Sequence, residues 1–260
     1  MEKENSNKEQ EAQLIELCKK ITSLAREEGV LLRALGAVAF RIHCPQFKYI
    51  EYDSGRFLSD LDFATYHSHI IGVERIFAKL GFMQDERVKV LHGNQRRIFD
   101  HLETGWHADV FVDRLSFCHD IDFHGRLEVD FPTIPLAELL LEKLQIVNFE
   151  LKDAIDSVVL VREHDIGEND NETINCKVIA RICSSDWGFW NTIQLNLEKI
   201  RHFTEESKIL KPVDKEDIIK KVGFLKRVID EEPKTVGWKL RAKVGEKKKW
   251  YKDVEDIERK

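Results

Sequence analysis

The stretch Ser59-Asp60-Leu61-Asp62-Phe63 sets two acidic side chains two residues apart among apolar neighbours. Successive side chains on a β-strand point to opposite faces, so Asp60 and Asp62 would share one face while the apolar residues share the other and can be buried. A second alternating segment, residues 107–113, carries a further acid, Asp109, between two small apolar residues. If the two strands are neighbours in one sheet, three carboxylates come together.

Three carboxylates at one place predict a metal site. Without a counter-ion they would repel one another, whereas divalent cations hold all of them ionised. Two cations about 3.5 to 4 Å apart are the usual arrangement for phosphoryl and nucleotidyl transfer. We therefore expect Asp60, Asp62 and Asp109 to be metal ligands rather than general bases. Asp113 lies on the same face of its strand as Asp109 and is an alternative third ligand.

The pattern around these acids predicts a sheet flanked by helices. Residues 9–28 form an amphipathic helical pattern that ends at Gly29, and residues 69–80 form another that ends at Gly81. Short alternating runs at residues 82–129, broken by turn residues, are typical of antiparallel strands.

The pattern changes after Pro132. Helices are expected at residues 136–147, 152–164, 187–203 and 214–229. Ser184-Ser185-Asp186 is typical of a helix N-cap, and no clear strand follows Pro132. We therefore predict an α+β fold with two parts, an α+β core at residues 1–131 and an all-helical C-terminal region at residues 132–260.

Composition narrows the possible function classes. An apolar fraction of 42% and a charged fraction of 34% are typical of a globular protein, and the net charge of −6 argues against a protein that coats nucleic acid with its whole surface. The cysteines are five in number and form no CxxC pair, which indicates reduced thiols in a cytoplasmic protein rather than a disulfide framework or a zinc site. No apolar run approaches the roughly 20 residues that cross a bilayer, so no membrane association is expected.

One segment differs from the overall charge balance. Residues 234–252 contain eight lysines and arginines and a single acid, Glu246. A solvated helix face is one interpretation of this segment, and a phosphate-binding patch is the other. The second interpretation would suit an RNA acceptor.

The order of these motifs resembles the nucleotidyltransferase superfamily related to polymerase beta. Gly36-Ala37 follows an apolar segment at residues 30–35, and Arg56, Asp60-Leu61-Asp62 and Asp109 come after it. The resemblance implies a nucleotidyltransferase-like mixed sheet flanked by helices, in which the amides of Gly36 and Ala37 at a helix N-terminus hold a triphosphate. It also implies that Asp60, Asp62 and Asp109 bind Mg²⁺ in a two-ion site, and that Asp109 helps to orient the acceptor hydroxyl.

The C-terminal region is similar to the abortive-infection toxin branch of that superfamily and to related uncharacterised proteins. The similar segments are residues 139–147 with Lys143, Lys152-Asp153 with Asp156 downstream, and Ser185-Asp186-Trp187-Gly188. The similarity implies that Lys143 and Lys152 contribute to nucleotide binding. Lys143 could instead be a solvated lysine on an amphipathic helix.

Two positions depart from the family pattern. Ala37 replaces the usual second glycine or serine, which removes a hydroxyl but still allows close backbone approach. Leu58 stands where the toxin branch often has a hydroxyl, and Ser59 beside it would supply one. Arg56 could hold a phosphate through its planar guanidinium, or pair with one of the acids.

The predicted function is Mg²⁺-dependent transfer of a nucleoside monophosphate, from a nucleoside triphosphate such as ATP to a hydroxyl or phosphate acceptor, in a cleft between the two regions. RNA, a small molecule and a protein hydroxyl are the candidate acceptors. The alternative is a catalytically inactive, nucleotide-binding or structural member of the same fold, which the departures at Ala37 and Leu58 favour.

Overall fold

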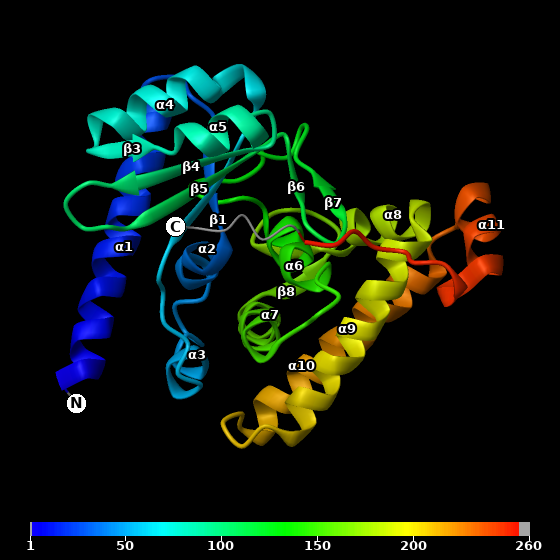
Figure 1. Cartoon of the computed structure of the whole chain (residues 1–260). Helices are drawn as coiled ribbons and strands as arrows, with labels where there is room; N and C mark the ends of the chain where they lie inside the picture. The colour runs from blue at the N-terminus through cyan, green and yellow to red at the C-terminus, as the bar shows by residue number, and fades with distance from the viewer. Residues whose placement is uncertain (1, 255–260) are drawn as a thin grey trace. The chain divides into compact units, whose positions relative to one another are not determined.

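The computed structural model describes residues 2–254, which divide into two compact units (Figure 1). Of the described residues, the first unit comprises 2–115 and 122–135, and the second comprises 116–121 and 136–254. The boundary predicted between residues 131 and 132 is close to the division between Pro135 and Leu136. The assignment of residues 116–121 to the second unit was not predicted.

The first unit is built on a five-stranded mixed sheet in the order β1-β2-β5-β4-β3. Its strands are β1 (Leu32–Leu35), β2 (Leu61–Thr65), β3 (Phe82–Gln84), β4 (Arg96–His101) and β5 (His107–Val112). The central pair, β2 and β5, is parallel, while β1 pairs with β2, β4 with β5 and β3 with β4 in antiparallel fashion. The expectation of antiparallel strands in residues 82–129 is therefore correct for β3, β4 and β5 among themselves, but β5 also pairs in parallel with β2.

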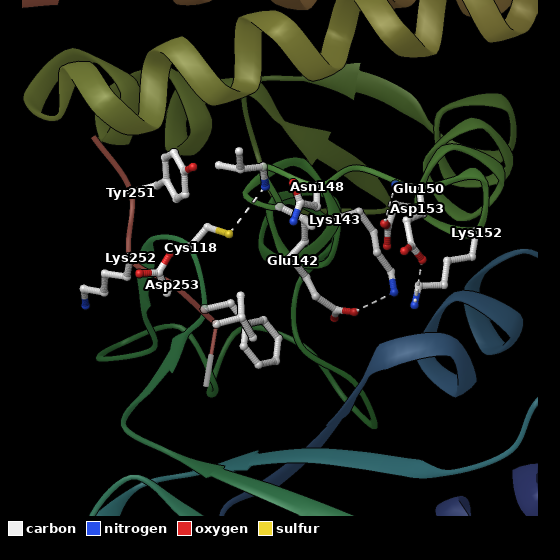
Figure 2. A pocket seen from close by; sticks show the side chains of 14 residues that line it. Cys118, Glu142, Lys143, Asn148, Glu150, Lys152, Asp153, Tyr251, Lys252 and Asp253 are labelled. Atoms are coloured by element: carbon white, nitrogen blue, oxygen red, sulfur yellow. Dashed lines mark hydrogen bonds and ion pairs between the residues drawn. The ribbon is translucent and has the colours of Figure 1, made fainter. Parts of the chain in front are cut away.

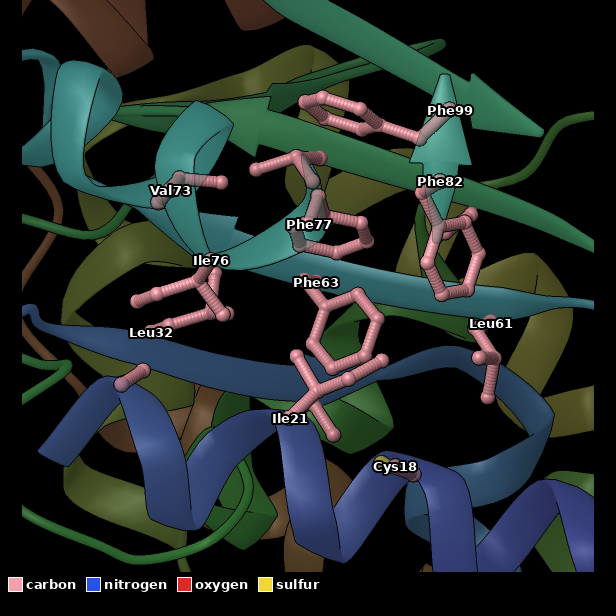
Figure 3. Packing of buried hydrophobic residues seen from close by; sticks show 14 of the residues in the cluster. Cys18, Ile21, Leu32, Leu61, Phe63, Val73, Ile76, Phe77, Phe82 and Phe99 are labelled. Atoms are coloured by element: carbon pink, nitrogen blue, oxygen red, sulfur yellow. The ribbon is translucent and has the colours of Figure 1, made fainter. Parts of the chain in front are cut away.

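Two helices and one face of this sheet enclose the core of the first unit. The helices are α1 (Glu2–Glu27) and α4 (Ile70–Lys79), which confirm the helical patterns expected there. Their buried side chains meet Phe63 of β2, whose ring packs edge-on against Phe77 of α4 at 5.7 Å, and Phe77 stacks on Phe99 of β4 at 4.3 Å (Figure 3). Burying such a side chain contributes roughly 1.5 to 3 kcal/mol. This core fixes which face of the sheet is apolar.

The remaining elements of the first unit are short. They are α2 (Gly36–His43), α3 (Tyr49–Asp53), η1 (His67–His69) and α5 (Glu86–His92). Neither α3 nor α5 was expected from the sequence. Asp85 caps the N-terminus of α5, because its carboxylate accepts hydrogen bonds from the amides of Arg87 and Val88. The helix buries only Val88. Its apolar pattern is therefore too weak to indicate a helix.

The second unit is mainly helical, as predicted. Its helices are α6 (Leu136–Leu144), α7 (Leu151–Glu163), α8 (Cys176–Ser185), α9 (Trp187–Glu206), α10 (Pro212–Glu231), α11 (Val236–Val244) and the 3₁₀ turn η2 (Gly245–Lys247). Asp186 caps α9 by accepting from the amide of Phe189, which confirms the N-cap expected at Ser184-Ser185-Asp186. Two short parallel strands, β8 (Asp165–Gly167) and β9 (Thr173–Asn175), correct the expectation that no strand follows Pro132.

A two-stranded sheet, β6 (Arg114–Ser116) with β7 (Asp120–Asp122), lies where the chain passes from the first unit to the second and back. All five cysteines are buried and none is in a disulfide, in keeping with the expected thiols. Among the described residues, no helix has both the length and the apolar character needed to cross a membrane.

Candidate functional site

Asp62 and Asp109 are direct neighbours on the two central strands. The parallel pairing of β2 with β5 places Asp62 opposite Asp109 and Phe63 opposite Val110. In-register neighbours point to the same face, and adjacent strands lie about 4.8 Å apart. Because Phe63 and Val110 belong to the buried core on one face, both acids lie on the other face. The structure thus brings together two of the three acids that the sequence singled out.

Gly36 lies directly against the carboxylate of Asp62. Leu35 is the antiparallel partner of Asp62, so the residue after Leu35 is held beside that side chain. A Cβ atom at position 36 would be 2.2 Å from Oδ2 of Asp62, and the backbone of Gly36 has a positive φ of 69°. Only glycine satisfies both conditions without strain. The helix α2 starts at Gly36 with the buried Ala37 in its first turn, as the resemblance implied.

The carboxylate of Asp109 is paired with an arginine that the sequence analysis did not identify. Arg96 of β4 donates through Nη2 to Oδ2 of Asp109 at 2.6 Å, and their side chains are 18% and 5% exposed. The guanidinium carbon of Arg96 also lies 5.3 Å from the ring centre of Phe111. Asp109 therefore already has a protein cation at its carboxylate.

Asp60 is held less firmly than the other two acids. It immediately precedes β2 and is half-buried, and its Oδ1 accepts a hydrogen bond from the exposed Ser59 hydroxyl at 3.2 Å. Leu58, which stands at the departure from the family pattern, is buried. Ser59 thus contacts the acid beside it.

Asp113 lies beyond the other end of β5 from Asp109. Its amide donates to the carbonyl of Thr65 at the end of β2, and its Oδ1 accepts from the amide of His67 at 3.0 Å. Four residues of strand separate it from Asp109, roughly 13 Å. Asp113 closes the turn at the far end of the two strands, so Asp109 is the neighbour of Asp62 and Asp113 is not.

Arg56 interacts with backbone near its own position. Its Nη1 donates to the carbonyl of Phe57 at 3.2 Å, and its own carbonyl accepts from Nη2 of Arg41 at 3.3 Å. Arg41 in turn forms buried ion pairs with Glu11 and Glu51. Arg56 is therefore attached to the network that joins α1, α2 and α3.

Asp62 and Asp109 could hold a cation between them. Among residues 2–254, no group of three or more aspartate, glutamate, histidine or cysteine side chains is arranged to hold a metal ion. Asp62 and Asp109 offer carboxylate oxygens on one face of the sheet, which is the ligand chemistry that Mg²⁺ prefers. The third carboxylate, from Asp60, is not assembled with them.

Lys143 and Lys152 belong to the second unit, where both line one cavity of about 530 Å³ (Figure 2). Lys143 is 12% exposed and pairs with Oε1 of Glu142 at 3.1 Å and with Oδ2 of Asp156 at 3.2 Å. It is thus a partly buried, paired lysine rather than a fully solvated one. Lys152 is exposed and lies 3.2 Å from Glu150.

The same cavity is lined by Asp153 and by the C-terminal residues Tyr251 and Lys252. Asp153 caps α7 by accepting from the amide of Glu150 at 3.0 Å, and burial raises the pKa of its carboxyl. Lys252 pairs with Asp120 at 2.6 Å. Each of the three lysines that line the cavity thus pairs with an acid.

The basic segment at residues 234–252 has mixed roles. Lys234 donates to carbonyls at the end of α10, and Arg241 donates to the carbonyls of Gly245 and Lys248. These residues stabilise the local structure. Six other lysines of the segment are exposed. Lys249 pairs with Asp253 and Lys252 with Asp120, and the remaining four are Lys239, Lys243, Lys247 and Lys248.

The amino-acid sequence matches no family model and no curated protein. The structure is similar to a crystal structure of an antigenic nucleotidyltransferase-like protein from Paracoccidioides brasiliensis, with 11% sequence identity, a TM-score of 0.38, and coverage of 85% of this chain and 94% of that chain.

Proposed function

We propose that the protein is a nucleotidyltransferase that moves a nucleoside monophosphate from a nucleoside triphosphate to a hydroxyl or phosphate acceptor. One observation carries the proposal, the in-register pair Asp62 and Asp109 on the polar face of the sheet, with Gly36 at the start of α2 against Asp62. A backbone turn beside paired carboxylates suits a polyphosphate bound with its cation.

Different residues would bind the phosphates, hold the metal and orient the acceptor. The acceptor oxygen forms a bond to the α-phosphorus and the bond from that phosphorus to pyrophosphate breaks, while the proton of an acceptor hydroxyl passes to water. Gly36 and Ala37 would offer backbone amides to the phosphates, and Asp109 would orient the acceptor. Asp62 and Asp109 would hold Mg²⁺, which when bound stabilises the negative charge that develops on the phosphate oxygens. Asp60 is the carboxylate available to a second ion.

Lys143, Lys152, Arg56 and Ser59 are proposed nucleotide-binding residues. The common cavity of Lys143 and Lys152 supports a shared role for these two. A phosphate there would have to compete with the acids that now pair with both lysines. The exposed lysines within residues 234–252 support an RNA acceptor, because such lysines contact phosphates without a fixed geometry.

A second candidate function is nucleotide binding without turnover. The ion pair between Arg96 and Asp109 favours it, because Arg96 supplies at Asp109 the positive charge that a metal would otherwise supply. The substitution of Ala37 for the usual glycine or serine also favours it. A toxin-type activity and ATP as the nucleotide are also proposed, and only the resemblance of the sequence supports them.

Transfer of radioactive label from each of four α-labelled nucleoside triphosphates, with Mg²⁺, to total RNA, protein and small-molecule extracts tests the proposal. We expect transfer by the wild type and by Asp113→Asn, and none by Asp62→Asn or Asp109→Asn. Asp113→Asn is the matched control, because it makes the same chemical change at the residue that follows β5, away from Asp62 and Asp109. Transfer by both Asp62→Asn and Asp109→Asn would refute the mechanism, and nucleotide binding without transfer would favour the second candidate.

A further inference from the structure

Arg96 reaches Asp109 along the polar face of the sheet. In the pairing of β4 with β5, Arg96 is opposite Phe111 and Ile98 is opposite Asp109. The guanidinium therefore extends diagonally past the ring of Phe111 to Oδ2 of Asp109 at 2.6 Å. Both side chains are largely buried, so water screens the pair only weakly.

The next residue on β4, Arg97, forms an ion pair on the opposite face of the sheet. Arg97 points to the other face, where its Nε lies 3.3 Å from Glu74 of α4. Both arginines thus neutralise an acid, but only the acid of Arg96 belongs to the in-register pair. Arg96 is therefore the arginine of β4 that bears on the proposed cation site, and Arg97 is a matched control for it.

A carboxylate oxygen bound to a guanidinium is a poor metal ligand, because the bound guanidinium and the metal repel each other. A divalent cation that uses Asp109 has to displace Arg96 or share the carboxylate with it. Among the described residues, no third carboxylate is assembled with Asp62 and Asp109 to offset this competition.

We propose that Arg96 is the resident cation of Asp109 and that it competes with a divalent cation for this carboxylate, so that the site has low affinity for metal alone. The proposal rests on the proposed function only in taking Asp62 and Asp109 as a cation site. The triphosphate of an incoming nucleotide would offer the guanidinium another anionic partner, since arginine binds phosphate through two parallel hydrogen bonds. Bound nucleotide would then raise the affinity of the site for the metal, and bound metal would raise its affinity for the nucleotide by the same factor.

Binding of Mn²⁺ alone, followed by the electron paramagnetic resonance signal of the free ion, tests this without any turnover. We expect the wild type and the control Arg97→Gln to bind Mn²⁺ weakly. Arg96→Gln should bind Mn²⁺ about 10-fold to 100-fold more tightly, because the metal no longer has to break a charge-assisted hydrogen bond to Asp109. The double variant Arg96→Gln, Asp109→Asn should lose this gain. A non-hydrolysable triphosphate should tighten Mn²⁺ binding in the wild type more than in Arg96→Gln.

Arg96→Lys keeps the positive charge and serves if Arg96→Gln does not fold. A lysine contacts the carboxylate as a more strongly hydrated point charge, so Mn²⁺ should bind this variant more tightly than the wild type. Unchanged or weaker Mn²⁺ binding in the folded Arg96 variant, or an equal gain in Arg97→Gln, would overturn the inference. Tighter Mn²⁺ binding in a protein that transfers no label would leave it standing while the proposed function fails.

Discussion

Replacing Gly36 with alanine tests how the fold holds Asp62. The backbone at position 36 has a φ of 69°, a region that costs an L-residue about 1 to 2 kcal/mol. The new Cβ would lie 2.2 Å from Oδ2 of Asp62 and 3.0 Å from its Cβ and Cγ. Since carbon atoms pack at about 3.5 to 4.0 Å, the carboxylate would have to move by roughly 1 Å.

The strand cannot easily make this movement, because the sheet holds Asp62 between Leu35 on one side and Asp109 on the other. Such overpacking typically costs about 1 to 3 kcal/mol, and the lower entropy of the unfolded alanine variant returns about 0.4 to 1 kcal/mol. We therefore expect Gly36→Ala to lower the free energy of unfolding by about 2 to 4 kcal/mol, measured by urea denaturation.

Gly55→Ala is the matched control. Gly55 has a φ of 73° but no atom lies within 4 Å of its would-be Cβ, so alanine there meets only the backbone cost. In the background of Asp62→Ala, which removes Oδ2, the effect of Gly36→Ala should fall towards that of Gly55→Ala. Equal losses for Gly36→Ala and Gly55→Ala, or no coupling to Asp62→Ala, would show that the reasoning about this contact is wrong.

Two further predictions concern buried charges and titration. Arg41→Met leaves the carboxylates of Glu11 and Glu51 buried without their arginine, so urea denaturation should show a loss of about 3 to 5 kcal/mol, and a loss well below that would mean that the acids find other compensation. Burial beside Thr192 lowers the pKa of His119 from 6.5 to about 4. Between pH 4 and 6.5 the unfolded state therefore binds a proton at His119 that the folded state does not bind. The free energy of unfolding keeps its full value above pH 6.5 and falls by about 3 kcal/mol as the pH drops to 4. His119→Leu should flatten the fall in the free energy of unfolding over that interval, and an unchanged slope would contradict the assignment.

Local alternation was enough to predict the polar face that carries Asp62 and Asp109. The apolar residues beside both acids had to be buried, and the core around Phe63 and Val110 is where the structure buries them. The resemblance to the nucleotidyltransferase pattern correctly placed Gly36 at the start of a helix. The structure supplies the physical reason, because the backbone there has a positive φ that glycine tolerates.

The partner of Asp109 was not predictable in this way. Arg96-Arg97 places two arginines in sequence, and local alternation says that they face opposite sides without saying which side carries the acids. That choice depends on β4 pairing with β5 so that Arg96 is opposite Phe111, a long-range register that no local pattern encodes. The small sheet of β8 and β9 was missed for a similar reason, since each strand has only three residues.

The four charged groups of the site differ in what holds them, and this decides which of them can move. Asp62 and Asp109 are fixed by backbone ladders on both sides, so their spacing is a property of the sheet. Asp60 lies outside the ladder and is held by the hydroxyl of Ser59, while Arg96 reaches Asp109 only through its long side chain. Arg96 can therefore leave Asp109 by side-chain rotation alone, while the strands keep Asp62 and Asp109 at their spacing.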